Sequence, residues 1–108
     1  MASARKKARK PIKVTDEMAA ILCAVGDGII REEVWEDVGG AVVRYNLAFI
    51  NFELFAGDNG RVLGYDNAHG RPHRHFAGTI EPVESAPYTK VLERFIAEVN
   101  TLRRRRKL

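Results

Sequence analysis

The segment from Ala41 to Phe55 constrains the fold more than any other part of the sequence, because β-branched and aromatic residues dominate it. In its first half, Arg44, Asn46 and Ala48 alternate with the apolar residues Val43, Tyr45, Leu47 and Phe49. This alternation predicts a strand with one face turned toward a core. The apolar positions change parity after Phe49, which predicts a bulge or bend between Phe49 and Ile50.

A turn and further strands are indicated on either side of this segment. Asp58, Asn59 and Gly60 tolerate positive φ, so the chain is expected to reverse there into RVLGYD as the second arm of a hairpin. Upstream, IIREEVWED at 29–37 reads as another strand that ends before a glycine pair. The segment TDEMAAILCAV at 15–25 contains good helix formers but is short, so helix and strand both stay open for it.

The last part of the chain predicts an amphipathic helix. Pro87 suits the first helical position, and apolar residues recur at helical spacing at Val91, Leu92, Phe95, Val99 and Leu102. We therefore expect an α+β fold, an antiparallel sheet of four or five strands with the C-terminal helix packed on one face. The expected organisation is a flexible basic tail at 1–13, a single domain at 14–102 and a basic C-terminal tail at 103–108.

Length and composition limit the class of protein. A chain of 108 residues is long enough for one hydrophobic core. No apolar run approaches the roughly 20 residues of a membrane-spanning helix, and no secretory signal pattern follows the basic N-terminus, so a cytoplasmic protein without membrane contact is expected. Cys23 is the only cysteine, which excludes an internal disulfide and a multi-cysteine metal site.

Charge is distributed unevenly along the chain. Basic residues concentrate in the first 13 residues and in RRRRK at 103–107, whereas 14 acidic residues face only seven basic ones between residues 14 and 102. Basic tails can hold the phosphates of RNA or DNA, and the C-terminal candidates for such contacts are Arg103, Arg104, Arg105 and Arg106. The other interpretation is that the tails are solvated and bind nothing.

The three histidines of the chain, His69, His73 and His75, lie within seven residues of one another. If the segment HRHF is extended, His73 and His75 project from one face of the sheet and Arg74 from the other. The glycine and proline that precede this segment predict a tight turn, which brings His69 or Asp66 back toward the pair. A compact polar site is therefore expected between residues 65 and 75.

Two imidazoles that titrate near pH 6.5 can act as base and acid, which is the chemistry that cleaves RNA through its 2′-hydroxyl without a metal. In this hypothesis His73 and His75 are the acid and the base in either order. Arg74 or Arg71 then stabilises the charged phosphorane, and Asp66 orients an imidazole.

Two other interpretations of the cluster stay open. The three histidines and Asp66 could bind zinc or another divalent ion. They could also form a surface turn in which the imidazoles hydrogen-bond to the backbone. Tyr65, Asn67 and Trp35 enter only as supporting groups.

The segment YDNAHGRPHRH, the Glu81-Pro82 step and the C-terminal helix together resemble the TumE-like toxin family of bacterial type II toxin–antitoxin systems, over roughly residues 28 to 100. The strand VVRYNLAFI looks like the central strand of that family. The resemblance implies a small toxin that is held in check by a helix-turn-helix antitoxin protein. The basic N-terminal tail, the RRRRK end and the VESAP spacing before the helix depart from the family pattern.

The leading hypothesis is thus a toxin-like endoribonuclease that has RNA as its substrate and needs no cofactor, with a homodimer left open. The competing hypothesis is a non-enzymatic module that binds nucleic acid or protein through its basic tails and its sheet.

Overall fold

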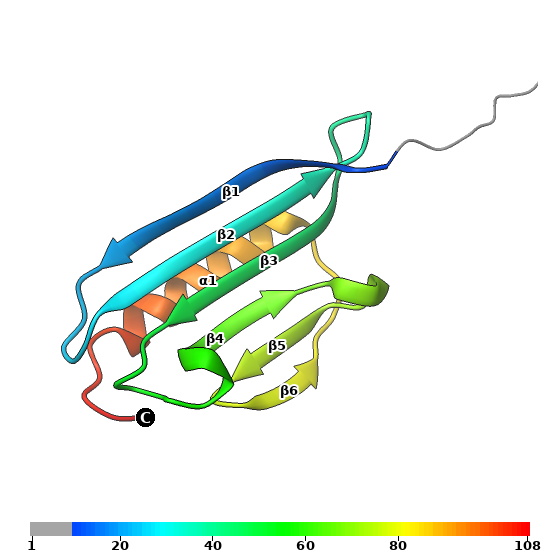
Figure 1. Cartoon of the computed structure of the whole chain (residues 1–108). Coiled ribbons are helices and arrows are strands. Elements are labelled where there is room, and N and C mark those ends of the chain that lie inside the picture. Colours follow the sequence, from blue (N-terminus) through cyan, green and yellow to red (C-terminus); the bar gives the residue numbers. More distant parts are fainter. Residues whose placement is uncertain (1–9) are drawn as a thin grey trace, which may run out of the picture.

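The computed structural model of the protein describes residues 10–108, which form an α+β fold of one sheet and one long helix (Figure 1). The six strands are antiparallel and follow chain order, β1-β2-β3-β4-β5-β6. Their bounds are β1 Ile12–Ile21, β2 Gly28–Glu36, β3 Val42–Ile50, β4 Arg61–Asp66, β5 His73–Phe76 and β6 Thr79–Pro82. The helix α1 spans Tyr88–Leu102, and two single 3-10 turns, η2 Asp58–Gly60 and η3 Ala68–Gly70, flank β4.

The α+β class and the C-terminal helix are confirmed, but the predicted number of four or five strands is wrong because the sheet has six. The segment that was open between helix and strand is β1, and β6 has no counterpart among the predicted strands. All four residues of β6 are exposed, so the strand carries no alternation of apolar and polar residues that a sequence pattern could reveal.

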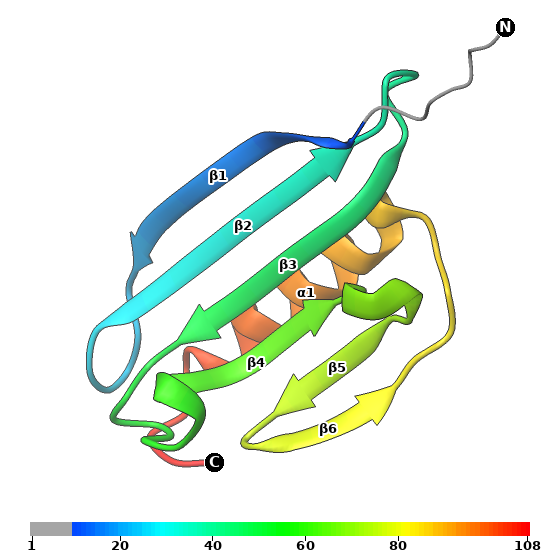
Figure 2. The same cartoon turned by 45° about the vertical axis from the view of Figure 1, so that its right-hand side comes forward.

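The helix covers one face of the sheet, across β3 and β4, as both views show (Figure 2). Alternate residues of β3 (Tyr45, Leu47 and Phe49) point into the core with Leu63 and Tyr65 of β4, and they meet Val91, Phe95, Val99 and Leu102 of α1. The predicted helical stripe is therefore buried. Pro87 is the N-cap residue, with extended backbone (ψ 146°), and not the first helical residue as predicted.

The predicted bulge and turn in the central hairpin are both present. The register between β3 and β4 shifts between Phe49 and Ile50, where the parity of the sequence changes. β3 ends at Ile50, so the expected continuation of the strand toward Phe55 is wrong, and a turn begins there instead. Asp58, Asn59 and Gly60 have φ values of 51°, 54° and 79°, the conformation for which these residues are suited.

The ends of the chain differ from the predicted tails. Residues 1–9 lie outside the described residues, and β1 begins at Ile12, within the segment predicted to be a flexible tail. At the other end, the side chain of Leu108 packs against the core. No helix in the described part of the chain is long and apolar enough to cross a membrane.

Candidate functional site

A row of polar residues crosses the sheet on the face that α1 does not cover. Cross-strand pairing places five residues side by side, one from each of the first five strands: Asp16, Glu33, Asn46, Asp66 and His73. Because alternate residues of a strand point to opposite faces, these side chains lie opposite the buried Tyr45, Leu47 and Tyr65. The sequence between residues 65 and 75 thus supplies only one end of a longer polar row.

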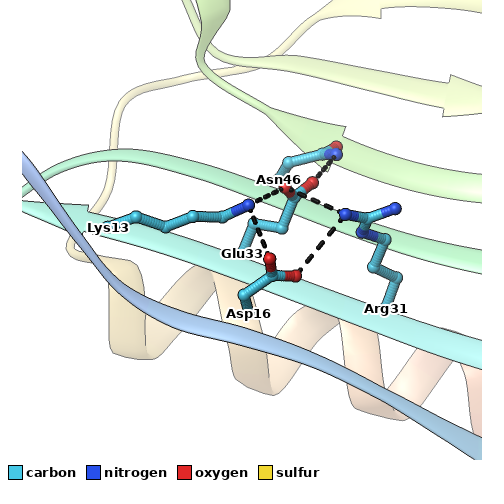
Figure 3. A network of polar contacts seen from close by, with 5 residues as sticks. All are labelled: Lys13, Asp16, Arg31, Glu33 and Asn46. Atoms are coloured by element: carbon cyan, nitrogen blue, oxygen red, sulfur yellow. Dashed lines mark hydrogen bonds and ion pairs between the residues drawn. The ribbon is translucent and has the colours of Figure 1, made fainter.

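The β1–β3 end of the row is an ion-paired network around Glu33 (Figure 3). Lys13 Nζ lies 2.6 Å from Glu33 Oε2 and 2.9 Å from Asp16 Oδ2, while Arg31 Nη2 lies 3.2 Å from Glu33 Oε2. The amide of Asn46 donates to Glu33 Oε1 at 2.8 Å. Burial opposes the charge of Glu33, but the hydrogen bonds from Lys13 and Asn46 outweigh it and lower the pKa of this carboxyl. Glu33 is an ionised residue whose two oxygens are already occupied.

The β4–β5 end of the row is built on a contact between Asp66 and His75. Nε2 of His75 lies 2.7 Å from Asp66 Oδ2, and the backbone N–H of Ala68 donates to Asp66 Oδ1 at 3.1 Å. His75 is only 9% exposed, and its Nδ1 is buried with no hydrogen-bond partner among the described residues. An unprotonated Nδ1 avoids a buried N–H without an acceptor, so the imidazole is expected to carry its proton on Nε2 and to donate it to Asp66. His75 therefore lies behind the carboxylate and holds it in place.

The other two histidines, His73 and His69, lie at the end of β4 and β5 where η3 joins the strands. His73 is the direct cross-strand partner of Asp66 and is half-buried. Side chains directly opposite each other have Cβ atoms about 5 Å apart, which puts the imidazole within reach of the same ligand as the carboxylate. His69 is in η3 with a φ of 61° and lines a cavity of about 370 Å³ together with Arg44 and Asn67.

Asn67 fixes the turn that carries His69. Its Oδ1 accepts the backbone N–H of Tyr45 at 2.9 Å, and its Nδ2 donates to the carbonyl of Val43 at 3.1 Å. The side chain thereby continues the pairing of β3 and β4 beyond the last residue of β4. The turn can change direction at Asp66 without leaving the backbone groups of β3 unpaired.

Arg74 lies on the helix-covered face, so the structure separates it from the three histidines and Asp66. Its Nε lies 3.1 Å from Glu98 Oε2, its Nη1 lies 3.3 Å from Glu81 Oε1, and a second contact with Glu98 comes from Nη2. The hydroxyl of Tyr65 donates to the same Glu98 carboxylate. Burial, followed by this hydrogen bond, raises the pKa of Tyr65 to about 12. Arg74 and Tyr65 fasten β4 and β5 to α1 beneath the site.

The C-terminal arginines are also distant from the Asp66 site. Nε of Arg103 donates to the carbonyl of Leu22 at 2.8 Å, and the backbone N–H of Ala24 donates to the carbonyl of Arg103 at 2.8 Å. Arg104 and Arg105 donate to the carbonyls of Asn100 and Lys107. Arg106 is exposed next to them. This cluster lies beyond the end of α1, at the end of the sheet opposite η3 (Figure 2).

A cavity of about 340 Å³ opens between the two ends of the polar row. Its wall includes Trp35 and Arg44, its polar groups come from Glu33, Asn46 and Asp66, and Ala68 of η3 closes one side. Sequence reasoning treated Trp35 as a supporting residue and did not single out Arg44, Glu33 or Asn46. No local motif marks them, because they reach the site only through strand register.

The zinc interpretation finds no ligand set in the structure. Within residues 10–108, no three His, Cys, Asp or Glu side chains are grouped so that they could hold a metal ion. Asp66 and His75 are in contact, but His69 lines a second cavity, which shares only Arg44 and Ala68 with the cavity at Asp66.

Comparison with protein-family models, curated proteins and solved structures finds no match for this chain. The fold and the site together define an α+β protein with a carboxylate–imidazole contact and a cavity on the uncovered face of its sheet. The resemblance to TumE-like toxins stays a prediction from the sequence.

Proposed function

We propose that the chain is a toxin-like, metal-independent endoribonuclease that cleaves RNA on the uncovered face of its sheet. The observation that carries the proposal is the carboxylate of Asp66. It is fixed by the buried His75 at 2.7 Å, faces a cavity and lies directly opposite a second titratable group, His73. A fixed carboxylate that faces a cavity and a partly exposed imidazole directly across the strand pair are the minimum equipment for general acid–base catalysis.

In the proposed reaction, Asp66 and His73 are the groups that exchange protons with the substrate. One of them removes the proton of the RNA 2′-hydroxyl, and the 2′-oxygen attacks the adjacent phosphorus. The bond from phosphorus to the 5′-oxygen breaks, and the other group protonates that oxygen. The products are a 2′,3′-cyclic phosphate and a free 5′-hydroxyl.

His75 is a positioning residue in this scheme. Its Nε2 is occupied by Asp66 and its Nδ1 is buried, so neither ring nitrogen can reach a substrate atom. This changes the role that the sequence suggested, in which His73 and His75 were the acid–base pair. The donation from His75 fixes the orientation of the Asp66 carboxylate, as the partner of a catalytic residue commonly does.

Basic side chains near the site are available for the phosphates. Arg44 is exposed at the rim of the cavity, and Arg71 is exposed at the end of η3, two residues before His73. Pro11 lines the same cavity as His69, so β1 enters the sheet near the site, two residues after Lys10. Four further basic residues precede Lys10 in the sequence. In the sequence, they offset part of the excess of acids in the folded region.

The biological role in this proposal is growth inhibition by RNA cleavage, restrained by a helix-turn-helix antitoxin. It is supported by the resemblance of YDNAHGRPHRH and the C-terminal helix to TumE-like toxins. A non-enzymatic binding module is the outcome that remains if no cleavage occurs.

The test is to induce the wild type, His73→Ala and Asp66→Asn in bacteria and to measure growth and the integrity of total RNA. We expect growth arrest and RNA fragmentation with the wild type only, because an acid–base group contributes on the order of 10²- to 10⁴-fold to the rate. Arg94→Gln, at an exposed position on α1, is the matched control and should behave as wild type. Unchanged growth and intact RNA in every culture would refute the proposal.

Purified protein separates the role of His75 from those of the catalytic pair. With a short RNA in the presence of EDTA, the product should carry a 2′,3′-cyclic phosphate. His75→Gln retains an N–H donor for Asp66 and should keep more activity than His75→Leu, with an unchanged shape of the pH–rate profile. Loss of one limb of that profile in His75→Gln would instead make His75 itself the acid or the base.

A further inference from the structure

The cavity next to Asp66 contains an aromatic side chain that the proposed reaction does not use. Trp35 is half-buried, and two cations lie near its ring, with Arg44 Cζ 4.6 Å and Lys13 Nζ 5.1 Å from the ring centroid. The three residues are cross-strand neighbours on β1, β2 and β3, one step along the strands from the row that contains Glu33 and Asn46. Aromatic rings and guanidinium planes on an open sheet are surfaces on which unstacked bases stack.

Apart from Arg44, the polar side chains that line the cavity, Glu33, Asn46 and Asp66, offer acceptor oxygens. A carboxylate cannot donate, so the hydrogen bond of 2.8 Å to Glu33 Oε1 must come from the Nδ2 group of Asn46. This orients the amide and leaves its carbonyl oxygen for a ligand. Asp66 adds a carboxylate at the other end of the cavity. The acceptor oxygens of Glu33 and Asn46 favour a neutral group that offers N–H donors at this end of the cavity, while Arg44 at the rim stays available for a phosphate.

The dimensions suit one nucleoside. Neighbouring strands are about 4.8 Å apart, so the cavity spans about 10 Å from β2 to β4. Trp35 lies at the β2 end and Asp66 at the β4 end, next to His73. A base at the Trp35 end thus leaves its ribose and phosphate at the proposed acid–base pair. The volume of about 340 Å³ is in the lower part of the range for small-ligand sites.

We propose that the cavity between Trp35 and Asp66 binds a nucleobase with an exocyclic amino group, adjacent to the phosphate that is cleaved. Adenine, cytosine and guanine carry such a donor, which meets the carbonyl oxygen of Asn46. Uracil presents carbonyl oxygens at these positions and is rejected by the acceptors. The inference rests on the proposed function in taking RNA as the ligand.

The test uses the fluorescence of Trp35, which is the only tryptophan in the chain. The full chain is titrated at low salt with 2′-O-methyl oligoadenylate, oligocytidylate and oligouridylate, which lack the 2′-hydroxyl that the reaction needs. Fluorescence anisotropy of end-labelled oligonucleotides measures the affinity in parallel. We expect adenylate and cytidylate to quench Trp35 and to bind about 5-fold or more tightly than uridylate.

Substitutions at position 35 test the stacking contact. Trp35→Leu should weaken the binding of oligoadenylate by about 5- to 150-fold, the range for the loss of one base–aromatic stack. Trp35→Phe keeps an aromatic ring and should retain most of the affinity. Phe52, which is 61% exposed and lies beyond the opposite end of β3, provides the matched control Phe52→Leu, with no expected change. Circular dichroism confirms that each variant is folded.

Three results would overturn the inference: binding that leaves Trp35 fluorescence unchanged, equal affinity for uridylate and adenylate, or unchanged binding in Trp35→Leu. Because these oligonucleotides cannot be cleaved, they test the base subsite independently of the proposed cleavage. RNA cleavage in cells without any base preference overturns the subsite alone. Base-selective quenching without cleavage supports the subsite and removes the catalytic proposal, and the absence of both overturns both.

Discussion

Asn51 and Asn67 are two bridging asparagines that differ mainly in burial, and this makes them a test of what stabilises the fold. Asn51 is fully buried directly after β3. Its Nδ2 donates to the carbonyl of Val25 at 2.9 Å, and its Oδ1 accepts the backbone N–H groups of Glu53 and Leu54 at 3.0 and 3.1 Å. The side chain thus joins the β1–β2 connection to the turn that ends β3.

We expect Asn51→Ala to lower the free energy of unfolding by about 3 kcal/mol, because each of the three hydrogen bonds of this buried side chain contributes about 1 kcal/mol and alanine replaces none of them. For a domain of this size, such a loss lowers Tm by roughly 15 °C. Asn67→Ala removes two comparable bonds to β3, but from a side chain that is only partly buried. Water can replace them there, so the expected loss is about 1 kcal/mol.

The assay is urea denaturation of wild type, Asn51→Ala and Asn67→Ala, followed by far-ultraviolet circular dichroism. Equal m-values in the three proteins are the control that the unfolded states are comparable. Losses for the two variants that agree within about 0.5 kcal/mol would refute the reasoning, since burial would then not decide the contribution of the asparagine.

Two predictions concern pH. Burial, with a hydrogen bond to Glu98, raises the pKa of Tyr65 to about 12, so the unfolded chain loses this proton first and stability should fall as pH rises from about 10 to 12. Tyrosinate absorbance of the folded protein should then appear at higher pH than that of the urea-unfolded protein, and coincident titration curves would contradict this. The pKa of Glu33 is lower in the folded protein than in the unfolded chain. The ionised carboxylate therefore stabilises the fold at a pH above its unfolded-state pKa, and this stabilisation is lost as the pH falls through its folded-state pKa. Lys13→Met removes a partner of Glu33, so the free energy of unfolding should fall less steeply toward acid pH than in the wild type. An equally steep fall in the variant would contradict this prediction.

The parts of the fold that could be predicted are those in which one face of an element is buried. The helix could be predicted from the spacing of Val91, Phe95 and Val99, because only one side of it meets the core. The alternation around Leu47 predicted β3 for the same reason. β1 is exposed along nearly all of its length, so residues such as Met18 and Ala19 carry no pattern and retain their preference for a helix. β6 is short and exposed, and it ends at a proline, as an edge strand can.

The candidate site likewise has one part that could be predicted from the sequence and one part that could not. The contact between Asp66 and His75 could be anticipated because a tight turn joins two short strands and local geometry decides their distance. Trp35 and Arg44 are far from that segment in sequence and reach it only through the register of β2, β3 and β4. A slip of one residue in that register would move both side chains to the helix-covered face. Their place at the cavity therefore required the structure.

The polar row itself shows why its two ends are expected to serve different purposes. Charged groups on a sheet face are costly unless their hydrogen bonds are satisfied, and at the β1–β3 end Glu33 receives Lys13, Arg31 and Asn46. The carboxylate of Glu33 is therefore already occupied, and it stabilises the edge of the sheet. At the β4–β5 end the ring of His73 has no side-chain hydrogen bond within the described part of the chain, and Asp66 can accept further donors. Unused hydrogen-bonding capacity next to a cavity is what a substrate can satisfy, so chemistry belongs at this end of the row and structural support at the other.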